Sequence, residues 1–284
     1  YKGTKMDPID LINNMKPLTP RKSKEQVWAE LEGLLEKPVQ APAKVRSIFS
    51  DQLKIAASII LIASLGVLAG LRFYTTTINC LPGQQKTAQL PDGSTVQLNA
   101  QSSIKFNPYW WKINREVNLD GEGYFKVQKG RKFTVISNQG STAVLGTSFN
   151  IYARDNDYEV TCLTGKVNVV AKQTKDQIII TPNQMVKLNA EGNLDTNLHV
   201  DAKLATQWTN GKFIFTQVPL HKVLSEIGRQ YNVSIKNIEN LNELYTGSFS
   251  KEPDVETVLD LISATFNISY TKSDLDVYTI QENK

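Results

Sequence analysis

The feature that most constrains this chain is an apolar run at residues 55–71, which reads IAASIILIASLGVLAGL and contains no charged residue. As an α-helix, its 17 residues would span about 26 Å, the short end of what crosses a bilayer. Lys54 and Arg72 bracket the run, and their long side chains can reach the headgroups on either side. We therefore predict one transmembrane helix over residues 55–73, with Lys54 and Arg72 as its flanks.

Two other interpretations of the run are a buried core helix and a signal peptide. A core helix in a soluble protein is rarely apolar on every face. A signal peptide would begin close to the N-terminus, whereas 54 residues precede this run. A lipoprotein signal would also need a matching cysteine motif, and Cys80 instead follows Thr77, Ile78 and Asn79.

Basic residues near the two ends of the run set its orientation. The N-terminal side has Lys37, Lys44, Arg46 and Lys54, whereas the C-terminal side has Arg72 and Lys86. By the positive-inside rule, residues 1–54 lie in the cytoplasm and the part after the helix lies in the periplasm. We thus expect a single-pass inner-membrane protein. The chain begins at Tyr1 and its first methionine is Met6, so we expect the true start to be missing.

The cytoplasmic arm, residues 1–54, contains one helix signal. Ser23 and Gln26 form an S-x-x-Q capping box, and Pro38 and Pro42 end the pattern that follows. A short isolated helix with one apolar stripe is not stable alone, so we expect another surface to cover the stripe. It can lie on the membrane surface or dock into a groove of a cytoplasmic protein. The stripe consists of Val27, Trp28, Leu31, Leu34 and Leu35.

Residues 87–191 change to short β-rich segments separated by turn signals, which is typical of an all-β sandwich, barrel or solenoid. Linkers are predicted at residues 74–86 and 192–210, on either side. The turn signals are Asp92-Gly93, Asp120-Gly121, Lys129-Gly130, Gln139-Gly140, Thr164-Gly165 and Glu191-Gly192.

Nothing in the sequence has the spacing of an enzyme, a metal site or a nucleic-acid-binding surface. There is no G-x-S-x-G, H-x-x-E-H or Walker motif, and the two histidines, His199 and His221, lie outside the β-rich segment. The net charge of +4 is dispersed along the chain rather than clustered on a basic face. We therefore expect no catalysis, cofactor, metal or direct nucleic-acid contact. Cys80 and Cys162 could pair, although Cys162 has the pattern of a small buried hydrophobe.

Residues 211–284 alternate strand and helix patterns and contain an internal repeat. VLSEIGRQYNVSI begins at Val223, and VLDLISATFNISY begins at Val258, 35 residues later. Both read V-L-x-x-I-x-x-x-aromatic-N-(V/I)-S. We predict two similar strand–helix–strand units in one small α+β domain, so that the whole chain is a multi-domain protein.

Five consecutive segments of the β-rich part resemble the FecR-type sensor domain, in the order of that family. They are LPDGSTVQLNAQSSIKF (90–106), REVNLDGEGYFKV (115–127), KFTVIS (132–137), AVLGTSFNIYA (143–153) and LTGKVNV (163–169). The resemblance implies an anti-sigma regulator. Its cytoplasmic arm would bind an extracytoplasmic-function sigma factor, and its periplasmic part would contact the signalling domain of a TonB-dependent outer-membrane receptor.

The last domain resembles the C-terminal domain of Bacteroidota-type FecR proteins, which is similar to the short N-terminal domain of secretins and TonB-dependent receptors. This resemblance implies an exposed sheet edge. We expect the domain to contact the receptor by strand pairing, and deletion of residues 274–284 to abolish receptor signalling. The main alternative is an envelope assembly or adaptor protein that uses this domain. A carbohydrate-binding or hydrolytic β-domain on a membrane stalk is a third class.

Some members of the family cleave themselves at a Gly-Thr bond, and Gly146-Thr147 is the matching dipeptide. A threonine hydroxyl can attack the preceding carbonyl carbon, but the usual activating base is not evident here. The other interpretation is that Gly146 lets the backbone pass a crowded bend.

Overall fold

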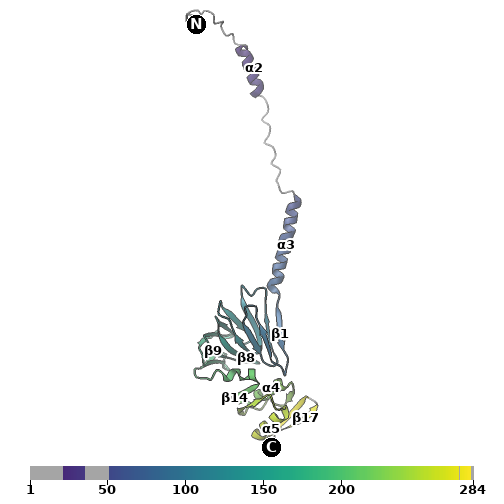
Figure 1. The fold of residues 1–284 in the computed structure, drawn as a ribbon, viewed down its shortest axis with the longest axis vertical. Helices are drawn as coiled ribbons and strands as arrows, with labels where there is room; N and C mark the ends of the chain where they lie inside the picture. Colours follow the sequence, from purple (N-terminus) through teal and green to yellow (C-terminus); the bar gives the residue numbers. More distant parts are fainter. Residues whose placement is uncertain (1–21, 36–50, 275, 283–284) are drawn as a thin grey trace, which may run out of the picture. The chain divides into compact units, whose positions relative to one another are not determined.

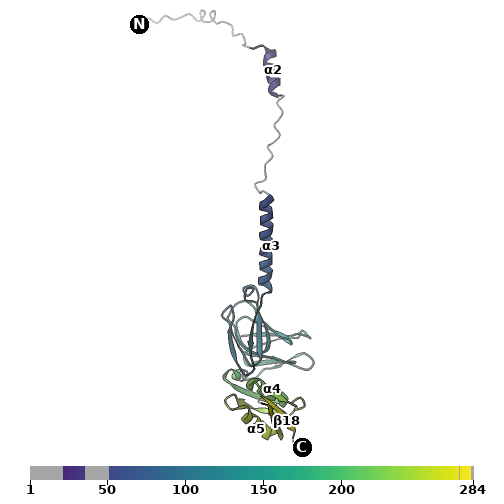
Figure 2. The same ribbon diagram turned by 90° about the vertical axis from the view of Figure 1, so that its right-hand side faces the viewer.

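The computed structural model describes residues 22–35, 51–274 and 276–282 (Figures 1 and 2). The chain divides into two compact units, Tyr1–Ile60 and Leu61–Lys284, and each is described by itself. The prolines predicted to end the first helix and the basic residues at 37, 44 and 46 lie outside the described residues.

Helix α2, Lys24–Leu35, begins where the sequence predicts. The backbone N–H of Ser23 donates to Oε1 of Gln26 at 3.0 Å, and the N–H of Gln26 donates to Oγ of Ser23 at 3.3 Å. This reciprocal pair satisfies two of the donors that a helix N-terminus leaves without a partner. The predicted capping box is confirmed.

Helix α3, Asp51–Phe73, contains the apolar run. Its segment Gln52–Phe73 is long and apolar enough to cross a membrane. Two hydroxyl groups within it bond to the helix's own backbone, because Ser58 donates to the carbonyl of Lys54 and Ser64 to that of Leu61, both at 2.8 Å. The described part of α3 therefore leaves few polar groups that need water.

The β-rich part is a sandwich of two antiparallel-dominated sheets that share one strand, β5 (Arg115–Lys126). Strand order in the first sheet is β1-β4-β5-β6-β7-β10-β11, and in the second β2-β3-β5-β8-β9-β12-β13. The remaining strands of the first sheet are β1 (Thr76–Cys80), β4 (Ser102–Phe106), β6 (Phe133–Ile136), β7 (Gly140–Val144), β10 (Val167–Ala171) and β11 (Gln177–Ile180). Those of the second are β2 (Lys86–Gln89), β3 (Thr95–Leu98), β8 (Ser148–Arg154), β9 (Asp157–Thr164), β12 (Gln184–Leu188) and β13 (Leu194–Asn197).

Strand β5 changes sheets at Gly121. Residues before it pair with β4 and β6, and residues from Gly121 onward pair with β3 and β8. Gly121 has φ +104°, and a Cβ there would lie 2.5 Å from Oγ of Ser102, so only glycine fits this bend. The sequence predicts a turn at Asp120-Gly121, and this is wrong: the strand continues through it.

One apolar core lies between the two sheets. Alternate residues of strands such as β6, β7 and β10 are buried, which is the pattern of a sheet with one covered face. Phe125 of β5 stacks on Phe149 of β8 with ring centroids 5.2 Å apart, and contacts Phe133 of β6 at 6.3 Å. These rings join the sheets, and the prediction of a β-sandwich, among the three architectures left open, is the one observed.

Both predicted linkers contain regular structure. Residues 74–86 include β1, which pairs with β4, and residues 192–210 include β13, which pairs with β12. Short polar strands at a sheet edge do not have a strong hydrophobic pattern, so the sequence did not reveal them. Cys80 therefore lies at the end of a strand rather than in a linker, and both Cys80 and Cys162 are buried and free.

The last domain contains the two predicted strand–helix–strand units. The first is β14 (Lys212–Pro219), α4 (Leu220–Tyr231) and β15 (Ser234–Lys236); the second is β16 (Leu244–Ser250), α5 (Val255–Phe266) and β17 (Ile268–Asp274), followed by β18 (Val277–Glu282). β14 pairs with β16, and β18 lies between β15 and β17. A 3₁₀ helix, η1 (Leu204–Asn210), precedes the domain.

The structure explains the letters shared by the two repeats. The valine, leucine and isoleucine positions of both helices are buried in one core. The shared asparagines, Asn232 and Asn267, end α4 and α5 in the left-handed conformation, with φ 56° and 51°. Asparagine is among the few residues other than glycine that adopt this conformation readily.

Candidate functional site

The predicted sigma-binding side chains form an uncovered apolar face on α2. Val27, Trp28, Leu31, Leu34 and Leu35 are 43 to 74% exposed, and no residue of α2 is buried. Within the described residues, nothing covers this face. A short amphipathic helix of this kind has the chemistry to fill an apolar groove.

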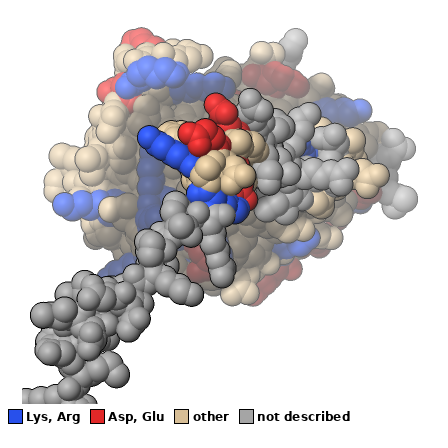
Figure 3. All heavy atoms as spheres, turned by 90° about the horizontal axis from the view of Figure 1, so that it is seen from above, with Lys and Arg blue, Asp and Glu red and all other residues tan. Residues whose placement is uncertain are grey.

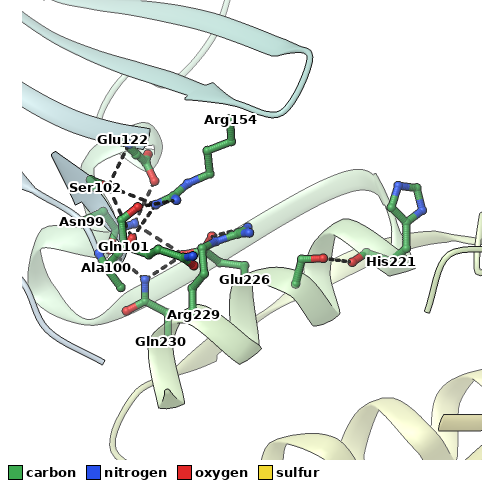
Figure 4. Close-up of polar contacts among 11 residues, drawn as sticks. Asn99, Ala100, Gln101, Ser102, Glu122, Arg154, His221, Glu226, Arg229 and Gln230 are labelled. Atoms are coloured by element: carbon green, nitrogen blue, oxygen red, sulfur yellow. Dashed lines mark hydrogen bonds and ion pairs between the residues drawn. The ribbon is translucent and has the colours of Figure 1, made fainter. Parts of the chain in front are cut away.

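A buried polar cluster, absent from the sequence predictions, joins the β-sandwich to the last domain (Figure 4). Glu122 of β5 and Glu226 of α4 are only 8% and 5% exposed. Asn99 lies between them: its Nδ2 donates to Oε2 of Glu122 at 2.8 Å and approaches Oε1 of Glu226 at 3.5 Å. Two carboxyl groups from different domains thus share one amide.

Neighbouring donors fix the orientation of the amides around Glu122. The indole Nε1–H of Trp208 can only donate, and it donates to Oδ1 of Asn150 at 3.2 Å. Asn150 must therefore turn its NH₂ toward Glu122, where it donates to Oε1 at 2.9 Å. In the same way, the N–H of Ala100 donates to Oδ1 of Asn99 at 2.8 Å. Glu122 is consequently held by two fixed donors.

Residues of α4 surround Glu226. Nε of Arg229 donates to Oε2 of Glu226 at 2.8 Å, and Nε2 of Gln230 donates to Oε1 at 2.7 Å. Gln230 also donates to Oδ1 of Asn99 at 2.8 Å, which is a direct bond between α4 and the sandwich. On the sandwich side, Nη2 of Arg154 donates to the carbonyl of Ala100 at 2.7 Å and places a buried positive charge beside the two carboxyl groups.

The two carboxyl groups have opposite pKa directions. Burial, followed by the nearby charge of Glu226, raises the pKa of Glu122 to about 7. Burial would also raise the pKa of Glu226, but Arg229, Arg154 and the hydrogen bonds of Gln230 and Arg229 outweigh it and lower that pKa. Near neutral pH, the pair therefore tends to carry one negative charge and one exchangeable proton.

Glu122 and Glu226 face a cleft of about 610 Å³ lined by residues of both domains, including Asn150, Trp208 and Lys222. Lys222 of α4 forms an ion pair with Asp157 of β9 at 2.5 Å. These contacts suit a joint between two domains rather than a catalytic centre. Among residues 22–35, 51–274 and 276–282, no group of three or more His, Cys, Asp or Glu side chains is placed to hold a metal ion.

The Gly146-Thr147 dipeptide lies just before β8. Gly146 has φ +147°, and a Cβ there would lie 2.6 Å from the Cα of Lys129, so the close passage of Lys129 by itself requires glycine. Thr147 is buried, and its Oγ1 has no hydrogen-bond partner in the part of the chain that the structure describes. The carbonyl of Thr147 accepts from the N–H of Val127 at 2.9 Å. No histidine lies in residues 87–191 to activate the hydroxyl.

The free strand edges of the last domain lie outside β18. β18 lies at the centre of its sheet, paired with both β15 and β17, and its Tyr278 and Ile280 are buried in the core. Strand pairing with a partner would therefore use an edge other than β18. Among the described strands, β14, β15, β16 and β17 each pair on one side within this domain.

A signal for the buried cluster was present in the repeat. At an offset of 35 residues, Glu226 of α4 corresponds to Leu261 of α5, and Gln230 corresponds to Thr265. The first helix thus carries Glu and Gln where the second carries Leu and Thr, and this is the face of α4 that contacts the sandwich. The sequence signal for Glu122 was weaker. It consists only of a charged residue placed between two glycines, Gly121 and Gly123.

Lys and Arg side chains are mixed with Asp and Glu side chains on the face seen in Figure 3. On that face, neither sign forms a continuous patch.

Comparisons with known proteins match both folded domains. A family model described as FecR protein matches residues 76–168, and one described as FecR, C-terminal matches residues 212–279. No curated protein matches the chain at a significant level.

Two crystal structures of a proposed anti-sigma factor from Parabacteroides distasonis ATCC 8503, at 1.65 Å and 2.50 Å resolution, are similar to this chain. Sequence identity is 27% and 28%, and the TM-score is 0.67 in both comparisons. Each match covers 74% of this chain and 100% of the other.

We expect Glu122 to make stability fall as the pH rises. The folded chain keeps the Glu122 proton up to about pH 7, whereas the ordinary pKa is 4.5. The contribution of Glu122 is complete below pH 4.5 and is lost as the pH rises to about 7, at a cost of about 3 kcal/mol. Glu122→Gln, which cannot ionise, should remove this part of the pH dependence in denaturant unfolding followed by tryptophan emission.

Glu191→Gln is the control, because Glu191 is an exposed carboxylate outside the cluster. It should keep the wild-type pH dependence. If Glu122→Gln keeps it as well, Glu122 does not hold a proton in the folded chain.

We expect the chain to remain intact at Gly146-Thr147, because the contact with Lys129 explains the glycine and no base is present. The mass of the purified chain, followed over days, should show one full-length species for both wild type and Thr147→Ala. Two fragments divided between residues 146 and 147, seen in wild type alone, would show that the threonine hydroxyl cleaves the bond.

Proposed function

Because the chain belongs to the FecR family, we propose that it is an anti-sigma regulator that spans the inner membrane once, with its N-terminus in the cytoplasm. In this proposal, α2 holds an extracytoplasmic-function sigma factor, and residues after α3 lie in the periplasm. There the last domain receives the signalling domain of a TonB-dependent outer-membrane receptor. The protein acts by protein–protein contact, without catalysis or a cofactor.

The observation that carries the proposal is the uncovered apolar face of α2. This 12-residue helix has the length at which isolated helices are marginal in water. Its N-terminus is nevertheless well capped, and its large apolar side chains share one face. Trp28, 58% exposed, has the size typical of a side chain that anchors an interface. A partner protein that binds α2 through this face buries the apolar side chains and thereby stabilises the helix.

The composition of α3 supports the membrane position. Its apolar segment has a mean hydropathy of 2.1 and is 0% buried within the protein. Exposing such a helix to water is unfavourable, and a bilayer removes this cost. Lys54 and Arg72 then lie toward the two headgroup layers.

For the receptor contact, β16 and β17 each have an edge that neither cleft occupies, and we propose the edge of β16. The other side of β14 lines the cleft against the sandwich, and β15 lines a second hollow beside Pro82 and Gln101. β16 begins at Leu244, an apolar residue that is 58% exposed. An added strand there gains main-chain hydrogen bonds, and Leu244 supplies an apolar contact beside it.

We expect Trp28→Ala and Leu31→Ala each to weaken sigma-factor binding by on the order of 2 kcal/mol, about thirtyfold in Kd. Ala29→Lys is the control, because residue 29 lies on the opposite side of the helix. Isothermal titration of the full chain in detergent with the purified sigma factor measures the change.

Full sigma-factor binding by the Trp28→Ala, Leu31→Ala double variant would exclude this face. If the double variant instead loses binding to lipid vesicles, α2 lies on the membrane surface. If no sigma factor binds the wild-type chain and envelope machinery co-purifies with it, the assembly or adaptor function is supported.

We expect a photo-crosslinking amino acid at Leu244 to form an adduct with the signalling domain of a TonB-dependent receptor from the same organism. Ile179 of β11 is the matched control, since its exposure of 61% is close to that of Leu244. Mass spectrometry identifies the adducts. A third probe at Leu261 of α5, which is 67% exposed, tests the helix face. An adduct at Ile179 alone would place the receptor on the β-sandwich, and one at Leu261 alone would place it on α5.

A further inference from the structure

The loop between β4 and β5, residues 107–114, is fixed to the end of α3. Nδ2 of Asn107 donates to the carbonyls of Leu71 at 3.0 Å and Arg72 at 2.8 Å. These carbonyls belong to the last turn of the helix, where backbone acceptors lack partners within the helix. The loop therefore caps α3 from the side of the β-sandwich.

Aromatic contacts reinforce this connection. The guanidinium of Arg72 lies 5.3 Å from the ring centroid of Trp110. The rings of Tyr74 and Tyr109 meet edge to face at 5.2 Å. The next residue, Trp111, is buried and contacts the rings of Phe106 and Phe133 of the sandwich core. The loop is thus held from both sides, by the helix end and by the core.

The outer side of the loop and the end of α3 beside it are apolar and aromatic. Exposed fractions are 79% for Phe73, 60% for Tyr109 and 65% for Ile113, and Tyr74 is also exposed. In a water-soluble domain, four such side chains gathered around a helix end would form an unusual surface. Tyrosine and tryptophan are the side chains that concentrate at the boundary between lipid tails and headgroups.

Basic groups accompany these side chains. Arg72 lies over Trp110, Lys112 is exposed within the loop, and the Arg131 guanidinium donates to the carbonyl of Lys112. The nearby carboxylate of Glu116 accepts from Nδ2 of Asn114 at 3.0 Å. Cationic side chains beside aromatic ones suit a surface of anionic lipid headgroups.

We infer that loop 107–114 rests in the headgroup layer of the bilayer that α3 enters, and holds the β-sandwich against the membrane. The occupant of this surface is lipid, because the loop is bonded to the last turn of the apolar helix and its exposed side chains continue the aromatic end of that helix. The inference depends on the proposed crossing of the membrane by α3.

The test compares two tryptophan probes in the full chain, reconstituted into vesicles of phosphatidylglycerol and brominated phosphatidylcholine. Ile113→Trp places the probe in the loop, and Ile179→Trp places it on β11. The two isoleucines have similar exposures, 65% and 61%, and three strands separate β11 from β5 in the sheet. Subtracting the wild-type spectrum removes the emission of the four native tryptophans.

We expect brominated lipid to quench the added emission of Ile113→Trp, with little loss for Ile179→Trp, when both variants unfold at the wild-type temperature. Equal quenching of both probes, or none of either, overturns the docking of the loop. Extraction of the vesicles with alkaline carbonate tests the crossing separately. A chain that stays in the vesicles but shows no quenching at 113 retains the crossing and loses the docking. A chain that carbonate removes contradicts both.

Discussion

The position of strand β5 is the constraint on which most of this structure depends. One strand supplies hydrogen-bonding partners to both sheets of the sandwich, and it can do so only because Gly121 bends where a side chain would collide with Ser102. The next residue, Glu122, is thereby directed out of the apolar core toward the second domain. The geometry of the sheets and the position of the buried carboxyl group thus have one cause.

The buried polar cluster around Glu122 and Glu226 selects one orientation of α4 against the sandwich, rather than simply adding stability. Burying two carboxyl groups costs free energy unless nearby groups compensate for it, and here Asn99, Asn150, Arg154 and Arg229 do so. Such a network tolerates few alternative arrangements, because each donor has an assigned acceptor. It ties α4 to the sandwich in a defined orientation. The last domain is thereby connected through Asn99 to β5, whose other half pairs with β4 beside the loop at the helix end.

The sequence was sufficient for features that rest on local chemistry. The α2 capping box, the apolar helix, the β-rich domain and the duplicated strand–helix–strand units all have short-range patterns. It was insufficient where long-range pairing decides, as for β1 and β13, whose polar sequences resemble linkers, and for β18, whose pattern does not reveal that it is central. The Glu122–Glu226 cluster was not predicted for the same reason, since these residues lie more than a hundred positions apart and meet only in the folded structure.

The central place of β18 has a consequence for how the last domain assembles. Its two repeats resemble each other, yet neither can fold as an independent half, because β18 must enter between β15 of the first repeat and β17 of the second. The pairing with β15 is parallel and joins residues about 40 positions apart, and contacts of this range slow folding. The two repeats therefore behave as one cooperative unit, in which β18, the last strand in the sequence, completes the sheet of both repeats at once.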